Sequence, residues 1–331
     1  MTTLNLTWRL DRAITLTEVS NISNQVLDEV ERAIIGKRIV LEKLMAAILA
    51  SGHILLEDFP GLGKTLMARS FATVLGLDFK RIQFTPDLLP GDITGGYIFN
   101  RAENRFDLRK GPIFANIALA DEINRASAKV QSALLEAMQE GQVTLEGETL
   151  SLPEPFIVLA TQNPIEYEGT FPLPEAQLDR FMLKLSVGYP ELDDEREILH
   201  RRSERQQDEV NLSKVTNADA LREIQQAMED VHVDNDLKEY IAAIVHETRK
   251  ARRVAVGASP RASLSFLKIA RSYAVLQGRD YVLPDDIKYF AGDVLKHRII
   301  LQPEYWMSSK VTEDIIQDVF DRVPVPVVAE K

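Results

Sequence analysis

The stretch that decides the fold is His53-Ile-Leu-Leu-Glu-Asp-Phe-Pro-Gly-Leu-Gly-Lys-Thr65. It starts as a short apolar run, passes into a glycine-containing loop and leads into a helical pattern over residues 66–75. A loop between a strand and a helix can turn successive backbone N–H groups toward a phosphate chain, and the helix dipole adds positive potential. Lys64 would reach the β- and γ-phosphates, and Thr65 would offer its hydroxyl to Mg²⁺. The stretch therefore predicts a Walker A loop.

We expect nucleotide contacts from the whole loop and from the first residues of the helix. This set comprises Asp58, Phe59, Pro60, Gly61, Leu62, Gly63, Lys64, Thr65 and Leu66. The consensus for such loops has glycine at both ends, whereas this chain has Asp58 at the first position. We expect this departure to place a carboxylate near the phosphates.

A second signal is Ile117-Ala-Leu-Ala-Asp121-Glu122, an apolar strand that ends in two acidic residues. Asp121 could hold Mg²⁺ opposite Thr65, directly or through water. Glu122 would then be free to polarise the attacking water as a general base. Taken alone, an acidic pair after a strand is most often a solvated strand end. Downstream of a Walker A loop, it is typical of a Walker B motif.

Two further polar residues have both a functional and an ordinary interpretation. Asn163 follows an apolar run and could orient the water or bind the γ-phosphate, or it could serve the turn before Pro164. Arg180 ends a short capped helix and could be a plain C-terminal helix charge or a partner for Asp179. The residues alone leave these alternatives open.

The segment Ser259-Pro260-Arg261 has the pattern of a helix start, with Ser259 as the N-cap and Pro260 in the first turn. Arg261 also falls in the first turn, where a cation opposes the helix dipole. This placement weakly favours a bound phosphate as the compensating charge.

The first part of the chain alternates short apolar runs with helical patterns. The runs cover residues 53–57, 81–84, 117–120, 156–161 and 182–187. Such an alternation is typical of buried parallel strands with helices on both faces of the sheet, which is an α/β architecture. After Gly188-Tyr-Pro190 we expect the strands to stop. Helices are then predicted over residues 194–206, 218–229, 237–252, 261–277 and 285–296.

Two segments interrupt the alternation and predict hairpins. The first covers residues 96–108 with a polar tip at 100–105, and the second covers residues 142–152. On the pattern alone, both could equally be edges of the main sheet.

The second hairpin can be given a register. A four-residue loop would pair Leu145 with Leu150 and Val143 with Leu152, which places all four apolar side chains on one face. A two-residue loop would misalign these pairs. We therefore expect the longer loop.

The composition restricts the class of protein. The 331 residues carry 39 Lys and Arg against 50 Asp and Glu, a net charge of -11. Nucleic acid is not an expected partner, because phosphate binding needs a basic surface. The absence of Cys excludes disulfides and thiolate chemistry. We expect a cytoplasmic protein, because no apolar run is long enough for a membrane span and the N-terminus lacks a signal peptide's apolar core.

In this order the motifs resemble those of the AAA+ ATPases, and their amino-acid sequences are similar to those of the MoxR family. The resemblance covers about residues 22–323. The residues that carry it are Ile35-Gly36, Pro60-Gly-Leu-Gly-Lys-Thr65, Gly111-Pro-Ile-Phe114, Asp121-Glu-Ile-Asn-Arg-Ala126, Ala160-Thr-Gln-Asn-Pro164, Leu173-Pro-Glu-Ala-Gln-Leu-Asp-Arg-Phe181 and Gly257-Ala-Ser-Pro-Arg261.

The resemblance implies a parallel sheet of strand order 5-1-4-3-2 followed by an all-helical lid. It implies that Asn163 is sensor 1, that Arg261 is sensor 2, and that Arg180 is an arginine finger for the γ-phosphate of a neighbouring subunit. Ile35 and Gly36 would lie by the adenine of ATP. The two hairpins would face the pore of a ring.

We therefore expect an N-terminal extension (1–21), an α/β core with the two hairpins (22–189), a helical lid (190–323) and an extended tail (324–331). The hypothesis is Mg²⁺-dependent ATP hydrolysis by a homo-oligomeric ring, expected to be a hexamer, coupled to chaperone-like remodelling or maturation of a protein client. Family analogy makes a protein with a von Willebrand factor A domain one candidate client.

Two alternatives remain. One is a nucleic-acid-translocating motor, against which the acidic net charge argues. The other is a nucleotide-gated binding module with negligible hydrolysis, against which Glu122 and Arg180 argue.

Overall fold

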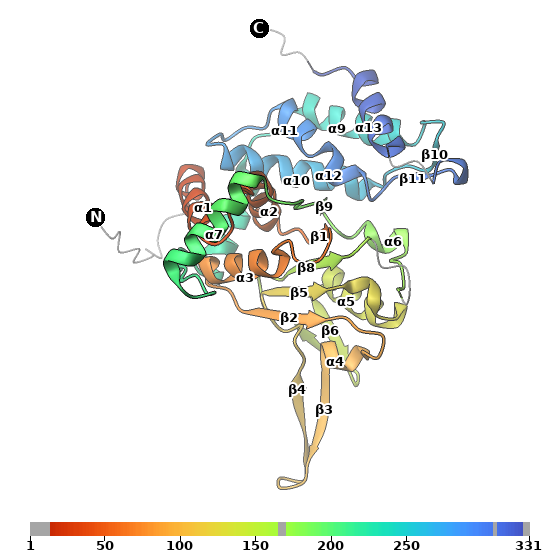
Figure 1. Ribbon diagram of the computed structural model, residues 1–331. Coiled ribbons are helices and arrows are strands. Elements are labelled where there is room, and N and C mark those ends of the chain that lie inside the picture. Colours follow the sequence, from red (N-terminus) through yellow and green to blue (C-terminus); the bar gives the residue numbers. More distant parts are fainter. Residues whose placement is uncertain (1–13, 165–169, 307–309, 327–331) are drawn as a thin grey trace.

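A parallel five-stranded sheet forms the centre of the computed structural model, which describes residues 14–164, 170–306 and 310–326 (Figure 1). The sheet order is β2-β5-β8-β1-β9, and every pairing is parallel. The strands are Ile54–Glu57 (β1), Phe79–Gln83 (β2), Ile117–Asp121 (β5), Ile157–Gln162 (β8) and Leu183–Leu185 (β9). Read from the opposite edge, this is the order 5-1-4-3-2, so the predicted fold class and strand order are confirmed.

Both faces of the sheet are covered. Ile54 and Leu56 of β1 enter one cluster of buried side chains, whereas Leu55 enters a second cluster. Ile117 and Ala118 of β5 divide in the same way. Because side chains alternate across a strand, the inner strands β1, β5 and β8 must be apolar on both sides. This explains why the strands could be recognised as continuous apolar runs.

Different helices cover the two faces. The first cluster contains residues from Leu16–Glu31 (α1), Arg38–Leu49 (α2) and Lys64–Leu75 (α3), and the second is covered by Ala128–Glu140 (α5). Two short helices, Pro90–Thr94 (α4) and Glu175–Leu178 (α6), lie in connections. The layers are therefore helix, sheet and helix.

The C-terminal part is helical, as expected. Its helices are Leu192–Arg205 (α7), Ala218–Ala227 (α8), Asn235–Thr248 (α9), Pro260–Leu276 (α10), Pro284–Tyr289 (α11), Ala291–Leu295 (α12) and Val311–Arg322 (α13). Short 3-10 turns cover Ile123–Arg125, Met228–Asp230 and Pro303–Tyr305.

Two details of this part were predicted wrongly. The expectation that no strand follows residue 190 is wrong, because Val254–Val256 (β10) pairs with Ile300–Leu301 (β11). These strands are too short to show a periodic pattern. The helix predicted over 285–296 is two helices, separated at Phe290, whose backbone is not helical (φ -98°, ψ 6°).

The helical part packs on the α1–α2 side of the sheet. Side chains of α9, α10 and α12 belong to the same buried cluster as those of α1, α2 and α3. A salt bridge of 2.6 Å between Lys43 Nζ and Asp293 Oδ2 also joins α2 to α12. The two parts of the chain therefore share one hydrophobic core.

A long hairpin, Gly95–Asn100 (β3) with Arg105–Lys110 (β4), extends away from the body of the protein (Figure 1). Its register pairs Phe99 with Phe106, and its tip is polar. Both hairpins form two-stranded sheets of their own and are not edges of the central sheet.

The register predicted for the second hairpin is wrong. Its strands are Gln142–Leu145 (β6) and Glu148–Ser151 (β7), and Val143 pairs with Leu150. Glu146 and Gly147 form a two-residue loop with φ of 48° and 86°, a primed turn whose twist suits a hairpin. The error is a shift of two residues, so the apolar side chains still share a face.

Among the described residues, no helix is both long and apolar enough to cross a membrane. Residues 1–13 of the predicted N-terminal extension and residues 327–331 of the predicted tail lie outside the described residues.

His53, directly before β1, is held as a neutral ring. Its Nδ1 accepts the backbone N–H of Val158 at 3.0 Å, so its Nε2 is the donor to the carbonyl oxygen of Met138, also at 3.0 Å. Burial lowers the pKa of His53 to about 4, although the hydrogen bond to Met138 opposes this shift.

We predict that the protein loses stability as the pH falls below 6.5, the ordinary histidine pKa. The folded pKa of His53 is the lower one, about 4. The unfolded chain therefore takes up the proton first, and the free energy of unfolding falls between pH 6.5 and about 4, by at most about 3 kcal/mol. Urea unfolding of His53→Gln at several pH values should show a flatter pH slope than the parent.

The exposed His200, changed to Gln, is the matched control and should leave the slope unchanged. His297, also buried with a lowered pKa, remains in both variants, so the slope flattens without vanishing. An equal slope in the parent and in His53→Gln would contradict the assignment.

Candidate nucleotide-binding site

The carboxyl ends of three neighbouring strands gather the predicted Walker and sensor 1 residues. The loop of residues 58–63 follows β1, Asn163 follows β8, and Asp121 ends β5 with Glu122 next to it. Because β8 lies between β1 and β5, these groups share one edge of the sheet. Ligands of open α/β sheets bind outside this edge. The structure thus brings these residues together.

The loop before α3 has the geometry of an anion site. Gly61 and Gly63 have φ of 84° and 78°, a region that favours glycine. A Cβ at either position would meet open space, so backbone conformation rather than crowding requires glycine. Gly63 is the N-cap of α3 and has no side chain to satisfy the first N–H groups. These free N–H groups and the helix dipole fit a phosphate chain.

Lys64, the first residue of α3, points back at this loop. Its ammonium donates to the carbonyl oxygens of Asp58 (2.6 Å) and Phe59 (3.2 Å). Burial lowers the pKa of Lys64, although the charges of Asp58, Asp121 and Glu122 act to raise it. A phosphate beside the ammonium would favour its charged form and offset the cost of burial.

The other predicted loop contacts differ in exposure. Pro60, Gly61 and Leu66 are exposed, and Phe59 and Thr65 are partly buried. Leu66 is 44% exposed, which leaves its side chain accessible to a ligand.

Asp58 takes the position where the consensus loop has glycine. Its carboxylate is buried and accepts hydrogen bonds from the Ser186 hydroxyl (2.9 Å) and from the backbone N–H of Val187. The carboxylate therefore has partners of its own within the protein, while its charge still acts on the ammonium of Lys64. Asp58 thus ties the start of the loop to the residues that follow β9, and its backbone carbonyl accepts a hydrogen bond from Lys64.

Asp121 is buried, and both of its carboxylate oxygens accept hydrogen bonds. Thr161 Oγ1 donates to Oδ1 at 2.6 Å, and Arg81 donates to Oδ2 from Nε (2.9 Å) and Nη2 (2.6 Å). In the described part of the chain, no group of three or more His, Asp or Glu side chains could enclose a metal. Protein-bound Mg²⁺ often uses one or two carboxylates and takes its other ligands from phosphates and water. Asp121 and Thr65 fit such a role.

Glu122 has an unusual backbone and two side-chain partners. Its φ is 56° and its ψ is 50°, the left-handed region that non-glycine residues seldom occupy. Its N–H donates to Thr161 Oγ1 at 2.8 Å. Its carboxylate accepts a hydrogen bond from Gln83 Nε2 (2.8 Å) and lies 3.3 Å from Arg125 Nε. Strained residues of this kind cluster at functional sites.

Sequence reasoning missed Gln83, Thr161 and Arg81 as members of this site. Gln83 stands opposite Asp121 in the pairing of β2 with β5, and only that pairing brings its amide to Glu122. No local pattern marks these residues, because their role depends on which strands are neighbours.

Lys37, the residue after Ile35 and Gly36, links their segment to the Walker A loop through Tyr189. Lys37 Nζ donates to the carbonyl oxygen of Tyr189 at 2.7 Å, and the Phe59 ring lies 6.1 Å from the Tyr189 ring. Tyr189, which the sequence suggested only as a boundary residue, therefore joins the two segments. A base stacked there would meet aromatic and aliphatic surface.

Arg180 and Arg261 lie at the opposite edge of the sheet. Both line a cleft of about 340 Å³ whose wall includes Gly52 and His53, which precede β1. Lys268, two turns along α10 from Arg261, lines the same cleft. The Nε of Arg180 has no hydrogen-bond partner among the described residues. This cleft therefore presents several cations from the amino-terminal edge.

The strand direction separates these arginines from Lys64. Arg180 precedes β9 and Lys64 follows β1, and the two strands are parallel neighbours. The four residues of β1 alone span about 13 Å. Within one chain, the structure therefore does not bring Arg180 or Arg261 to the predicted phosphate site.

The sequence matches two family models. Residues 53–183 match the ATPase family associated with various cellular activities (AAA), and residues 246–319 match the AAA lid domain. A crystal structure of a protein from Cytophaga hutchinsonii superposes with a TM-score of 0.88 at 42% identity, covering 94% of this chain and 97% of that chain.

Several curated proteins are similar over most of their length. Chaperone MoxR1 of Mycobacterium tuberculosis is 45% identical over 90% of this chain and 81% of its own length. An uncharacterised protein of Bacillus subtilis, YeaC, is 49% identical over 92% of this chain and 94% of its own length. Protein MoxR of Methylorubrum extorquens is 29% identical over 90% of this chain and 93% of its own length.

We predict that Asp58→Gly, which restores the loop consensus, destabilises the protein. The change removes the acceptor of the buried Val187 N–H and of the exposed Ser186 hydroxyl. A buried N–H left unpaired costs about 1–3 kcal/mol. Urea unfolding should show this loss, and Asp58→Asn, which keeps one acceptor, should lose less. Unchanged stability together with tighter ATP binding would instead place the carboxylate beside the phosphates.

Proposed function

Because the chain belongs to the MoxR family of AAA ATPases, we propose that it is a Mg²⁺-dependent ATPase that assembles into a ring, a hexamer. Each ATP would be bound by the Walker A loop of one chain and completed by Arg180 and Arg261 of the next. Hydrolysis would drive chaperone-like remodelling or maturation of a protein client.

The separation of the two edges of the sheet carries this proposal. Lys64 and Asp121 lie at the carboxyl edge, and Arg180 and Arg261 line a cleft at the amino edge. A chain with a phosphate site on one edge and arginines on the other can bring the two together by head-to-tail contact. Such contacts form a ring when the rotation between neighbouring chains closes. An arginine finger is worth about 10³–10⁵ in rate in the GTPases where it has been measured.

The residues of the carboxyl edge supply the chemistry of hydrolysis. Lys64 would bind the β- and γ-phosphates, and Thr65 with Asp121 would hold Mg²⁺, which neutralises phosphate charge. Glu122 would accept a proton from the attacking water as the oxygen–phosphorus bond forms. Asn163, buried at the end of β8 between these groups, would orient that water.

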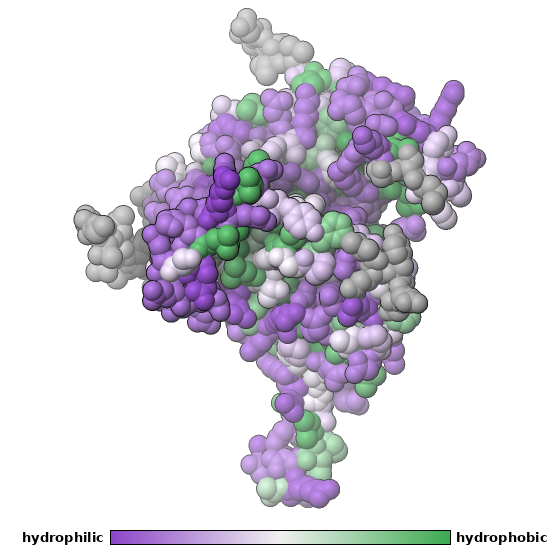
Figure 2. Space-filling view, in the orientation of Figure 1, coloured by the Kyte–Doolittle hydropathy of each residue, from purple (hydrophilic) through white to green (hydrophobic). Residues whose placement is uncertain are grey.

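The β3–β4 hairpin suits a protein client. Ile98, Phe99 and Phe106 are 50%, 46% and 66% exposed on it, and Figure 2 shows apolar surface on this projection. Its basic Arg105 lies 2.7 Å from both Glu103 and Asp107, which offsets its charge. Exposed apolar and aromatic side chains favour protein contacts.

The M. tuberculosis relative is named a chaperone, which supports a remodelling role. We extend that role to this chain, with a von Willebrand factor A domain protein as one candidate client.

We predict that Glu122→Gln binds ATP as the parent does but loses turnover. The amide keeps the size of the side chain and its contact with Gln83, yet it cannot accept the proton, so turnover should fall about 100-fold or more. Fluorescent-nucleotide binding and steady-state phosphate release measure the two quantities. Glu136→Gln, an exposed change on α5, is the control. Normal turnover in Glu122→Gln would exclude Glu122 as the base.

We also predict that two inactive variants restore activity when mixed. Arg180→Ala keeps an intact phosphate site, and Lys64→Ala keeps an intact Arg180. An interface is complete when the first variant supplies the phosphate site and the second supplies Arg180, which occurs at about a quarter of the interfaces in a randomly mixed ring. Phosphate release by each variant alone and by the mixture gives the result. Mixed assemblies without recovered activity would show that Arg180 does not act on the neighbouring site.

A further inference from the structure

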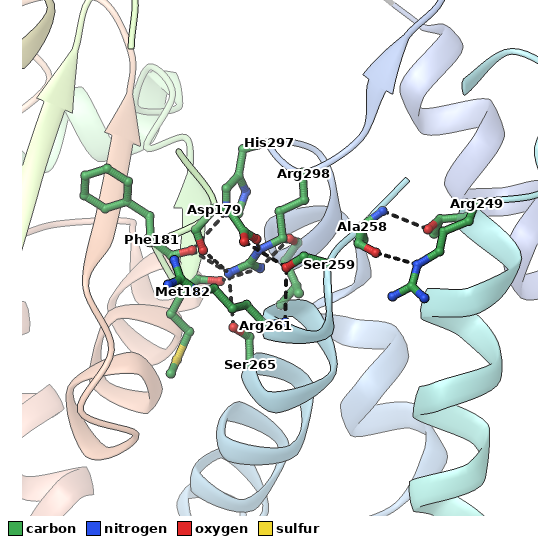
Figure 3. Close-up of polar contacts among 12 residues, drawn as sticks. Asp179, Phe181, Met182, Arg249, Ala258, Ser259, Arg261, Ser265, His297 and Arg298 are labelled. Atoms are coloured by element: carbon green, nitrogen blue, oxygen red, sulfur yellow. Dashed lines mark hydrogen bonds and ion pairs between the residues drawn. The ribbon is translucent and has the colours of Figure 1, made fainter. Parts of the chain in front are cut away.

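Arg298, which follows α12 in the lid, is buried and reaches into the core (Figure 3). Its Nε donates to Asp179 Oδ1 at 2.9 Å. Its Nη2 donates to the carbonyl oxygen of Phe181 at 2.6 Å, and its Nη1 donates to that of Met182 at 3.2 Å. The guanidinium thus contacts residues on both sides of Arg180.

The same guanidinium is fixed within the lid. Nη1 also donates to the carbonyl oxygen of Val294 (2.7 Å), and Nη2 to Ser265 Oγ on α10 (3.1 Å). The neighbouring His297 adds a further contact, because its Nε2 lies 3.0 Å from the carbonyl oxygen of Phe181. A planar fork of five donors can hold this many acceptors at once in one geometry.

The carboxylate of Asp179 joins a third segment to this contact. Its Oδ2 accepts a hydrogen bond from Ser259 Oγ at 2.8 Å (Figure 3). Ser259 is the N-cap of α10, and its Oγ also accepts the N–H of Arg261 at 3.1 Å. Asp179 is adjacent to Arg180 in sequence, and Ser259 is two residues from Arg261. One carboxylate therefore sets the backbone beside both arginines of the cleft.

The charge state of this contact is stable. Burial lowers the pKa of Arg298 to about 10, although Asp179 acts to raise it. Arg298 therefore remains protonated near neutral pH. Moving the segment of residues 179–182 away from the lid would leave the buried charge of Arg298 without its partner, which is strongly destabilising for the protein. The segment therefore has little freedom to move relative to the lid.

We propose that Arg298 is a positioning residue that, through Asp179, holds Arg180 and Arg261 in one fixed arrangement toward the nucleotide of the neighbouring chain. This inference rests on the proposed action of the two arginines on a neighbour's ATP. Arg298 borders the cleft, but its guanidinium is almost fully buried and already bonded to protein acceptors, so we assign it no direct contact with ATP. Its effect is on where Arg180 points.

Other contacts keep the lid docked without Arg298. The shared hydrophobic core joins α10 to α1 and α2, and Lys43 pairs with Asp293. Gln225 on α8 donates to the carbonyl oxygen of Ile48 at 2.7 Å. Loss of Arg298 should therefore loosen the 179–182 segment while the fold and the phosphate site at the opposite edge persist.

The test compares Arg298→Met with Arg180→Ala in assembled full-length protein. We expect Arg298→Met to bind fluorescent ATP with a Kd within about twofold of the parent, while kcat falls roughly 10- to 100-fold, as misplacement of a catalytic group by about an ångström can cause. Mixing it with Lys64→Ala, which supplies an intact finger, should restore turnover as it does for Arg180→Ala. Arg298→Lys should have a kcat close to that of Arg298→Met, because one ammonium cannot make the several hydrogen bonds of the guanidinium.

Two further variants separate positioning from simple damage. Arg279→Met removes a lid arginine whose partner, Asp286, is also in the lid (2.6 Å), and it should leave kcat near that of the parent. Asp179→Asn keeps the shape of the side chain and removes its charge. If Arg298→Met does not fold, Asp179→Asn carries the test and should show the same kcat loss and the same recovery on mixing.

The possible outcomes are distinct. One outcome would overturn this inference alone: mixing with Lys64→Ala restores the turnover of Arg180→Ala but not that of Arg298→Met or Asp179→Asn. The defect of Arg298→Met or Asp179→Asn would then lie in its own phosphate site. Failure of Arg180→Ala to recover would overturn the proposed function and this inference together. A normal kcat in both Arg298→Met and Asp179→Asn would also overturn the inference.

Discussion

The common direction of the five strands is the constraint on which the rest of the structure depends. Parallel strands place all their carboxyl ends at one edge, so the loops after β1, β5 and β8 must meet there. The same direction places Arg180, which precedes β9, at the other edge. Arg261 of α10 lines the same cleft there, beside the residues that precede β1. A single chain therefore holds the two halves of the proposed catalytic site facing away from each other.

Strand β9 connects these two edges physically. Asp179 and the Arg298 contacts hold the chain just before β9, and Asp58 holds Ser186 and Val187 just after it. The strand between them is three residues long, about 10 Å. The start of the Walker A loop and the backbone beside Arg180 are thus fixed to opposite ends of one short strand that is itself paired with β1.

The sequence sufficed for features that depend on local pattern. Buried strands were recognisable because both faces of the sheet are covered, and the Walker A loop because Gly61 and Gly63 need positive φ before a helix. Contacts set by tertiary pairing were not accessible. Gln83 reaches Glu122 only because β2 lies beside β5, and Asp58 bonds to Val187 only because β9 lies beside β1. The Val143–Leu150 register was missed because the turn conformation at Glu146 outweighed the pattern of apolar pairs.

The most direct test of the account is the distance between Arg180 and the γ-phosphate in an experimental structure of the assembled protein with Mg²⁺ and a non-hydrolysable ATP analogue. The account predicts that the guanidinium of Arg180 lies about 3 Å from a γ-phosphate oxygen bound by Lys64 of the adjacent chain. An Arg180 directed to solvent, or to the phosphate of its own chain, would contradict it.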